Sequence, residues 1–251
     1  VEQFTVDARG LRGKSVARSP RTTLREYSAR FDDGGKRESF HVTYTRSGAT
    51  VSEREYLYSD DSVNVTNKQD TSVTRYSVAA QNRPFPFSID IFGAWQVALQ
   101  HALGAGKKEF GVVASKRVIS YTIEEISPGK LKLTNKEHDF EPLLAEVGSG
   151  NQLEKFDMTA TTDKFIAERV DLVDVDAVAK DFADREKAGK AFGVLSPRDT
   201  VRAEINGAHI LIDYGRPSAR GRTIFGNVVP WDSVWRTGAN AATQLITDKE
   251  I

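Results

Sequence analysis

The chain has 251 residues, and its 35 lysine and arginine side chains balance 35 aspartates and glutamates, so the formal net charge is zero. A neutral chain exerts no global attraction on nucleic acid or on an anionic membrane surface, which excludes a histone-like binder and predicts no nucleic-acid partner. Hydrophobic residues make up 39% and charged residues 28%, a balance typical of globular domains rather than disordered tails. The longest apolar runs are far too short for a transmembrane segment.

Cysteine is absent, which excludes thiol catalysis, disulfides and cysteine-bound metal centres. The sequence opens at Val1-Glu2-Gln3, with neither an initiator methionine nor an apolar leader. Either a targeting segment has been removed or the chain has been trimmed. A removed segment of this kind would associate the protein with a membrane.

Residues 1–82 are predicted to be β-structure. Apolar and polar residues alternate with a period of two, as in Phe40, Val42 and Tyr44, and turn-forming residues such as Asp33-Gly34-Gly35 interrupt the pattern. Because the connections between these segments are short, we expect an antiparallel meander.

A helix is predicted over residues 88–103, with Ser88 as its N-cap. Phe92, Trp95 and Leu99 recur at helical spacing and fall near one face. The first interpretation is that this face closes a β-sheet core. The alternative is that the three side chains line an apolar ligand cavity.

Strand patterns resume between residues 109 and 171, and a charged helical pattern follows at 173–188. We interpret residues 172–193 as a helical connector and residues 194–251 as a second domain, in which Asn206-Gly207 between two alternating runs predicts a hairpin. The predicted fold class is therefore mainly β with few helices. An antiparallel half-barrel or barrel over residues 1–171, closed by a helix, precedes a small, incomplete β-domain.

Catalytic patterns are weak throughout the sequence. The segment Ala8–Ser15 loosely matches a phosphate-binding loop, but Pro20 would fall inside the helix that such a loop requires, so a basic surface turn is the better interpretation. The four histidines show no metal-binding spacing, and there is no Gly-x-Ser-x-Gly elbow. We predict a non-enzymatic protein without cofactor or metal.

The densest unusual segment spans residues 214–243. Between 214 and 236 it carries four arginines and one aspartate, and it holds two of the chain's three tryptophans. Arginine beside tryptophan indicates either a partner-binding surface or internal stacking that fixes an irregular backbone. The candidate interaction residues are Arg216, Arg220, Arg222, Trp231, Trp235, Arg236 and Asn240.

The same segment resembles a bacterial family, domain of unknown function 2911. The resemblance rests on Tyr-Gly-Arg-Pro-Ser at 214–218, Gly-Arg at 221–222, Phe-Gly at 225–226, Val-Pro-Trp at 229–231 and Trp-Arg-Thr-Gly-Ala-Asn-Ala-Ala-Thr at 235–243. It implies a small β-rich, extracytoplasmic domain with no established activity. Since members of that family usually continue for many more strands, we expect the domain to be incomplete here.

Residues 1–171 are similar in pattern to the lipoprotein-localisation (LolA/LolB-like) fold, which implies an envelope protein whose concave apolar face can hold an acyl chain. Two hypotheses follow. The first is a non-enzymatic periplasmic interaction protein, an accessory or scaffolding subunit of a bacterial membrane complex whose partners are other envelope or membrane proteins. The alternative is a carrier of lipid or lipoprotein that uses the barrel interior around Phe92, Trp95 and Leu99.

Overall fold

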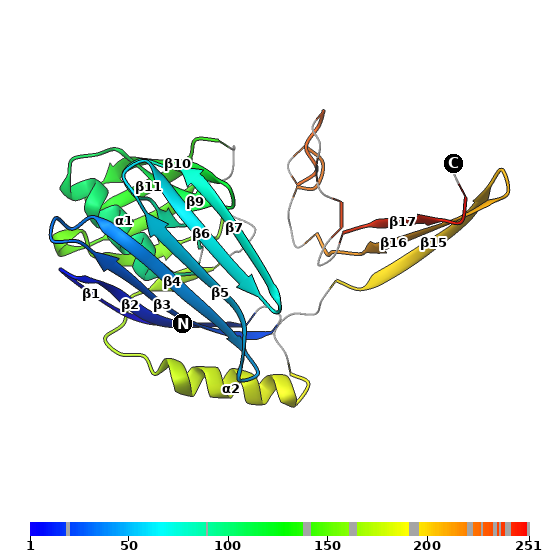
Figure 1. Cartoon of the computed structure of the whole chain (residues 1–251), viewed down its shortest axis with the longest axis horizontal. Coiled ribbons are helices and arrows are strands. Elements are labelled where there is room, and N and C mark those ends of the chain that lie inside the picture. Colours follow the sequence, from blue (N-terminus) through cyan, green and yellow to red (C-terminus); the bar gives the residue numbers. More distant parts are fainter. Residues whose placement is uncertain are drawn as a thin grey trace. The chain divides into compact units, whose positions relative to one another are not determined.

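The computed structural model describes residues 1–18, 21–88, 90–137, 142–160, 165–190, 196–219, 223–226, 228–232, 235, 237, 238 and 242–249. The chain divides into two compact units, Val1–Lys190 and Ala191–Ile251, which are drawn in Figure 1. Among the described residues, no helix is both long and apolar enough to cross a membrane.

Sheet A of the first unit is an antiparallel meander in which strand order follows chain order (Figure 1). The alternating pattern and short turns predicted this arrangement, and the mainly β fold class is confirmed. Its strands are β1 (Glu2–Asp7), β2 (Gly10–Arg18), β3 (Thr22–Phe31), β4 (Arg37–Arg46), β5 (Ala49–Tyr58), β6 (Ser62–Gln69) and β7 (Ser72–Ala79). The segment that loosely matched a phosphate-binding loop forms the β1–β2 turn and the start of strand β2.

Sheet B is a strongly curled half-barrel built from the rest of the first unit. Its order is β14-β13-β12-β11-β10-β9-β8, antiparallel except for the parallel pair β8 and β9. Its strands are β8 (Phe85–Pro86), β9 (Glu109–Ala114), β10 (Arg117–Ser127), β11 (Lys130–Asn135), β12 (Leu143–Val147), β13 (Leu153–Asp157) and β14 (Ile166–Glu168). A short 3₁₀ turn, Ser149–Asn151, joins β12 to β13.

Helix α1 (Phe92–Gly104) packs against both sheets and is buried on nearly every side. Its Ala94 and Val97 belong to the apolar cluster of sheet A, whereas Trp95 and Leu99 belong to that of sheet B. A helix shared by two sheets closes the core, as predicted, but it begins later than expected. Ser88 is not its N-cap.

The first turn of α1 is capped by a side chain from the N-terminal strand of the chain. Glu2 on β1 accepts hydrogen bonds from the Phe92 N–H at 2.6 Å and the Gly93 N–H at 3.0 Å. Its carboxylate also accepts one from the Tyr27 hydroxyl. Two of the free N–H groups of the helix start are thus satisfied by a residue from another element, and burial raises the pKa of this carboxyl group.

Helix α2 (Val175–Lys187) packs on strands β2 and β3 of the first unit. Val175 is buried, the Arg18 guanidinium lies 4.9 Å from the Phe182 ring centre, and Glu186 Oε2 accepts a hydrogen bond from the Thr22 N–H at 2.8 Å. Helix α2, in the segment expected to be a connector, therefore forms part of the first unit, because its apolar side chains pack on sheet A.

The second unit contains a three-stranded antiparallel sheet in its described part, β15 (Arg198–Ile205), β16 (Ala208–Gly215) and β17 (Gln244–Thr247), in that order. The predicted hairpin is confirmed. Asn206 and Gly207 join β15 to β16 with φ values of 51° and 76°, the left-handed pair that a tight hairpin turn requires.

Candidate functional site

Two aromatic rings stack on each other at the surface of the second unit. The Phe225 and Trp231 ring centres lie 6.0 Å apart with an interplanar angle of 18°. A small loop holds them, in which the Gly226 N–H donates to the Val229 carbonyl at 2.8 Å. A Cβ at position 226 would lie 2.9 Å from Trp231 Nε1, so glycine allows this close approach. Phe225 remains 68% exposed and Trp231 67% exposed.

One face of the three-stranded sheet is also apolar. The strand register pairs Val201 with Ile212, Ile212 with Leu245 and Ala203 with Ile210, and paired residues share a face. Val201 and Leu245 are nonetheless about half exposed. Monomeric proteins rarely leave contiguous large apolar patches uncovered, so this sheet face is a candidate interaction surface.

The structure describes three of the seven candidate interaction residues. Trp231 and Trp235 are exposed, whereas Arg216 donates a hydrogen bond to Asp199 Oδ2 at 3.2 Å, which ties it to the neighbouring strand. This ion pair lies at the surface, with the Arg216 side chain 61% exposed, so the choice between a partner-binding and an internal role for Arg216 stays open. The other candidates lie outside the described residues: Arg220, Arg222, Arg236 and Asn240.

The three residues expected to line an apolar cavity are core residues. Trp95 is 3% exposed and Leu99 0% exposed, and Phe92 packs against the same cluster. Four aromatic rings surround the Trp95 indole at centre distances of 5.0–6.2 Å, those of Phe87, Phe110, Tyr121 and Phe156. These packed rings occupy the space that the carrier hypothesis assigns to an acyl chain.

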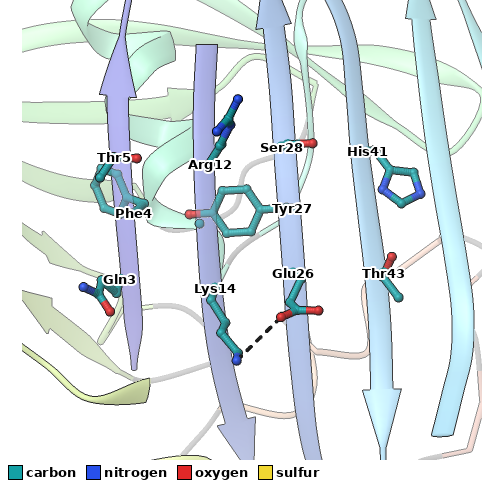
Figure 2. Close-up of a pocket in the computed structure, with 11 residues that line it drawn as sticks. Gln3, Phe4, Thr5, Arg12, Lys14, Glu26, Tyr27, Ser28, His41 and Thr43 are labelled. Atoms are coloured by element: carbon teal, nitrogen blue, oxygen red, sulfur yellow. Dashed lines mark ion pairs between the residues drawn. The ribbon is translucent and has the colours of Figure 1, made fainter. Parts of the chain in front are cut away.

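A second candidate site, missed from the sequence, lies on the face of sheet A that points away from the core. It is a groove of about 440 Å³ over β1 to β4 (Figure 2). Phe4, Gly13 and Tyr27 contribute to its lining. Its outward side chains are polar: Gln3, Thr5, Arg12, Lys14, Glu26, Ser28, His41 and Thr43.

Lys14 is the most strongly paired group in the groove. Its Nζ lies 3.5 Å from Glu26 Oε1 and donates a hydrogen bond to Asp176 at the start of α2. The hydrogen bond with Asp176 raises the pKa of Lys14. The side chain is therefore held protonated, which suits binding rather than nucleophilic attack.

Ser28, His41 and Glu55 follow one another in register across β3, β4 and β5. This is the residue order of a catalytic triad, but no hydrogen bond joins the three among the described contacts. A nucleophile needs its base within hydrogen-bond distance. The described residues also contain no group of three potential metal ligands. We therefore treat the groove as a binding surface.

Comparison with known families matches residues 196–251 to the model described as "Protein of unknown function (DUF2911)". This confirms the resemblance of the C-terminal segment. Comparison with curated proteins gave no match. Among solved structures, the chain is similar to a DUF1089 family protein from Pseudomonas aeruginosa, with a TM-score of 0.45 and 10% identity over 68% of this chain and 91% of that one. These comparisons name no enzymatic activity, and the LolA-like likeness of residues 1–171 stays a prediction.

Proposed function

We propose that this chain is a non-enzymatic interaction protein, an accessory or scaffolding subunit of a membrane-associated complex on the outer side of a bacterial inner membrane. One observation carries the proposal. The second unit holds a stacked, largely exposed Phe225–Trp231 pair and also a sheet whose apolar face retains half-exposed Val201 and Leu245.

Exposed aromatic side chains of this kind support recognition of a protein partner. Tryptophan is enriched among the few residues that supply most of the binding energy at interfaces, since it buries a large rigid surface. The stacked pair pre-organises both rings, so little side-chain freedom is lost on binding. The extracytoplasmic location rests on the family resemblance alone and is part of the proposal.

The test is native mass spectrometry of the protein purified gently from the envelope fraction of its own cells. We expect another polypeptide in a fixed ratio to wild type. Trp231→Ala should lose it, because removing a central tryptophan typically weakens an interface by more than tenfold. Leu57→Ala is the matched control, since Leu57 is an exposed apolar residue on β5 of the first unit.

Two outcomes would contradict the proposal. One is a polypeptide retained equally by wild type, Trp231→Ala and Leu57→Ala. The other is a bound mass of a few hundred daltons that organic extraction removes, with no polypeptide attached. That second result would favour the lipid-carrier alternative.

A further inference from the structure

The outward groove of sheet A contains one row of side chains with a particular composition. Strand register places Arg12 beside Ser28 and Ser28 beside His41, and all three line the groove (Figure 2). Neighbouring strands lie about 4.8 Å apart, so Arg12 and His41 flank the small Ser28 side chain at about 10 Å from each other. The row therefore has two larger nitrogen-bearing side chains with a gap between them.

In the adjacent row, the positive charge is compensated. There Lys14 is neutralised by Glu26 and by Asp176. Among the described residues, no carboxylate lies within ion-pair distance of the Arg12 guanidinium, and Arg12 is exposed within the groove lining. The groove thus combines one compensated cation with one uncompensated cation.

We propose that this groove binds a small molecule through an oxyanion, a carboxylate or a phosphate, held over Ser28 between Arg12 and His41. The planar guanidinium presents paired N–H donors that fit the oxygens of either anion. The Ser28 hydroxyl and an imidazole N–H of His41 supply further donors from the next two strands.

The volume of the groove sets the size of the ligand. About 440 Å³ lies within the range of small-molecule sites and is too small for a folded partner. Thr5 and Thr43, at the ends of the two rows, offer hydroxyl groups for the remainder of the ligand. The groove belongs to residues 1–190, so this proposal is independent of the protein-binding surface on the second unit.

The experiment is an amide NMR titration of the full chain at low ionic strength, with inorganic phosphate and acetate as separate probes and sodium chloride as the ionic-strength control. We expect saturable shifts centred on Arg12, Ser28 and His41 with at least one probe. Stronger binding of phosphate would assign the site to phosphate groups, and stronger binding of acetate would assign it to carboxylates.

Variants distinguish a specific site from general attraction. Arg12→Gln should weaken binding about tenfold, the usual effect of losing a charge-assisted hydrogen bond. Arg75→Gln removes an exposed arginine from β7 of the same sheet, and it should change the affinity for the anion by less than twofold. Unsaturable shifts, or an equal loss in both variants, would overturn the proposal. Unchanged amide shifts away from the groove will show that Arg12→Gln remains folded.

Discussion

Gly13 on strand β2 is a position where adding one methyl group should disrupt the first unit. A Cβ there would lie 2.1 Å from the Tyr27 hydroxyl oxygen and 2.2 Å from its Cζ. Both distances are far below van der Waals contact, and the obstacle is a buried aromatic ring. Tyr27 cannot easily move away, since its ring stacks on Phe40 at 6.0 Å and its hydroxyl donates to Glu2.

We expect Gly13→Ala to lower the free energy of unfolding by about 3 kcal/mol. Displacing the ring loses a hydrogen bond to a carboxylate, worth about 1.5–3 kcal/mol, and an aromatic contact worth about 0.5–1.5 kcal/mol. The sign of the change in unfolding free energy is informative, because alanine is otherwise favoured over glycine within a strand by about 0.5–1 kcal/mol. Gly13 itself has no left-handed backbone that would explain a penalty.

Urea unfolding followed by tryptophan fluorescence measures this effect. Trp95 is the single tryptophan of residues 1–190 and is buried in the core, whereas Trp231 and Trp235 are already exposed, so the emission shift on unfolding comes mainly from Trp95 and reports on the first unit. Gly104→Ala is the control, because a Cβ at the end of α1 would meet nothing within 4 Å. It should be neutral or slightly stabilising.

A double mutant tests the cause directly. In a Tyr27→Leu background the obstructing ring atoms are gone, so Gly13→Ala should cost less than about 1 kcal/mol, giving a coupling energy of about 2–3 kcal/mol. If Gly13→Ala costs as much in the Tyr27→Leu background as in the wild-type chain, the steric explanation is refuted.

Three further predictions concern the cap, the second helix and the tyrosines. Glu2→Ala should cost about 2 kcal/mol in urea unfolding, because it removes the α1 cap and leaves the Tyr27 hydroxyl unpaired; exposed Glu55→Ala should be nearly neutral, and equal losses would contradict the cap. Phe182→Ala should destabilise the first unit by about 1–2 kcal/mol if α2 is part of it, whereas no change in the Trp95 transition would indicate a free helix. Burial raises the pKa of Tyr56 to about 12, so the unfolded phenol loses its proton first, and stability should fall by about 2 kcal/mol as pH rises from 10 to 12. Absorbance at the tyrosinate band should show ionisation at a higher pH for the five tyrosines whose pKa is raised by burial, Tyr27, Tyr44, Tyr56, Tyr58 and Tyr121. Full ionisation near pH 10 in the folded protein would refute this.

The meander and the Asn206-Gly207 hairpin were predictable because their signals are local. Alternation and turn chemistry lie within a few residues of each other. Within the predicted β-region, Ala8–Ser15 is interpreted as a surface turn although strand β2 already begins at Gly10, and the reason is physical. Leu11 points into the core, whereas Val16 is buried although it lies on the opposite face. A strand covered on both faces does not alternate.

The start of α1 was misplaced because its cap is not local. Ser88 has the chemistry of an N-cap, but its hydroxyl donates to Asp90 instead, and the helix begins at Phe92. The carboxylate that caps it belongs to Glu2, ninety residues earlier. A pattern confined to a window of a few residues cannot identify a donor or acceptor supplied by another element.

The groove could not be predicted from the sequence, for a related reason. Its polar residues occupy alternate positions on four strands, the pattern expected of any solvent-facing surface. What distinguishes Lys14 from Arg12 is its acidic partners, and α2 supplies the decisive one, Asp176. That difference arises from tertiary packing of a helix that follows 162 residues later in the chain.

The two units use tryptophan in opposite ways, and this contrast connects the fold to the proposed function. In the first unit, two sheets and a shared helix enclose Trp95 completely, because a structure of three layers has an interior. The second unit offers a sheet of three strands in its described part, with Trp231 and Leu245 left at the surface. Sheets this small depend on a cover for their apolar face. We propose that a partner surface over β15 to β17 meets in the second unit the same physical requirement that α1 meets against two sheets in the first.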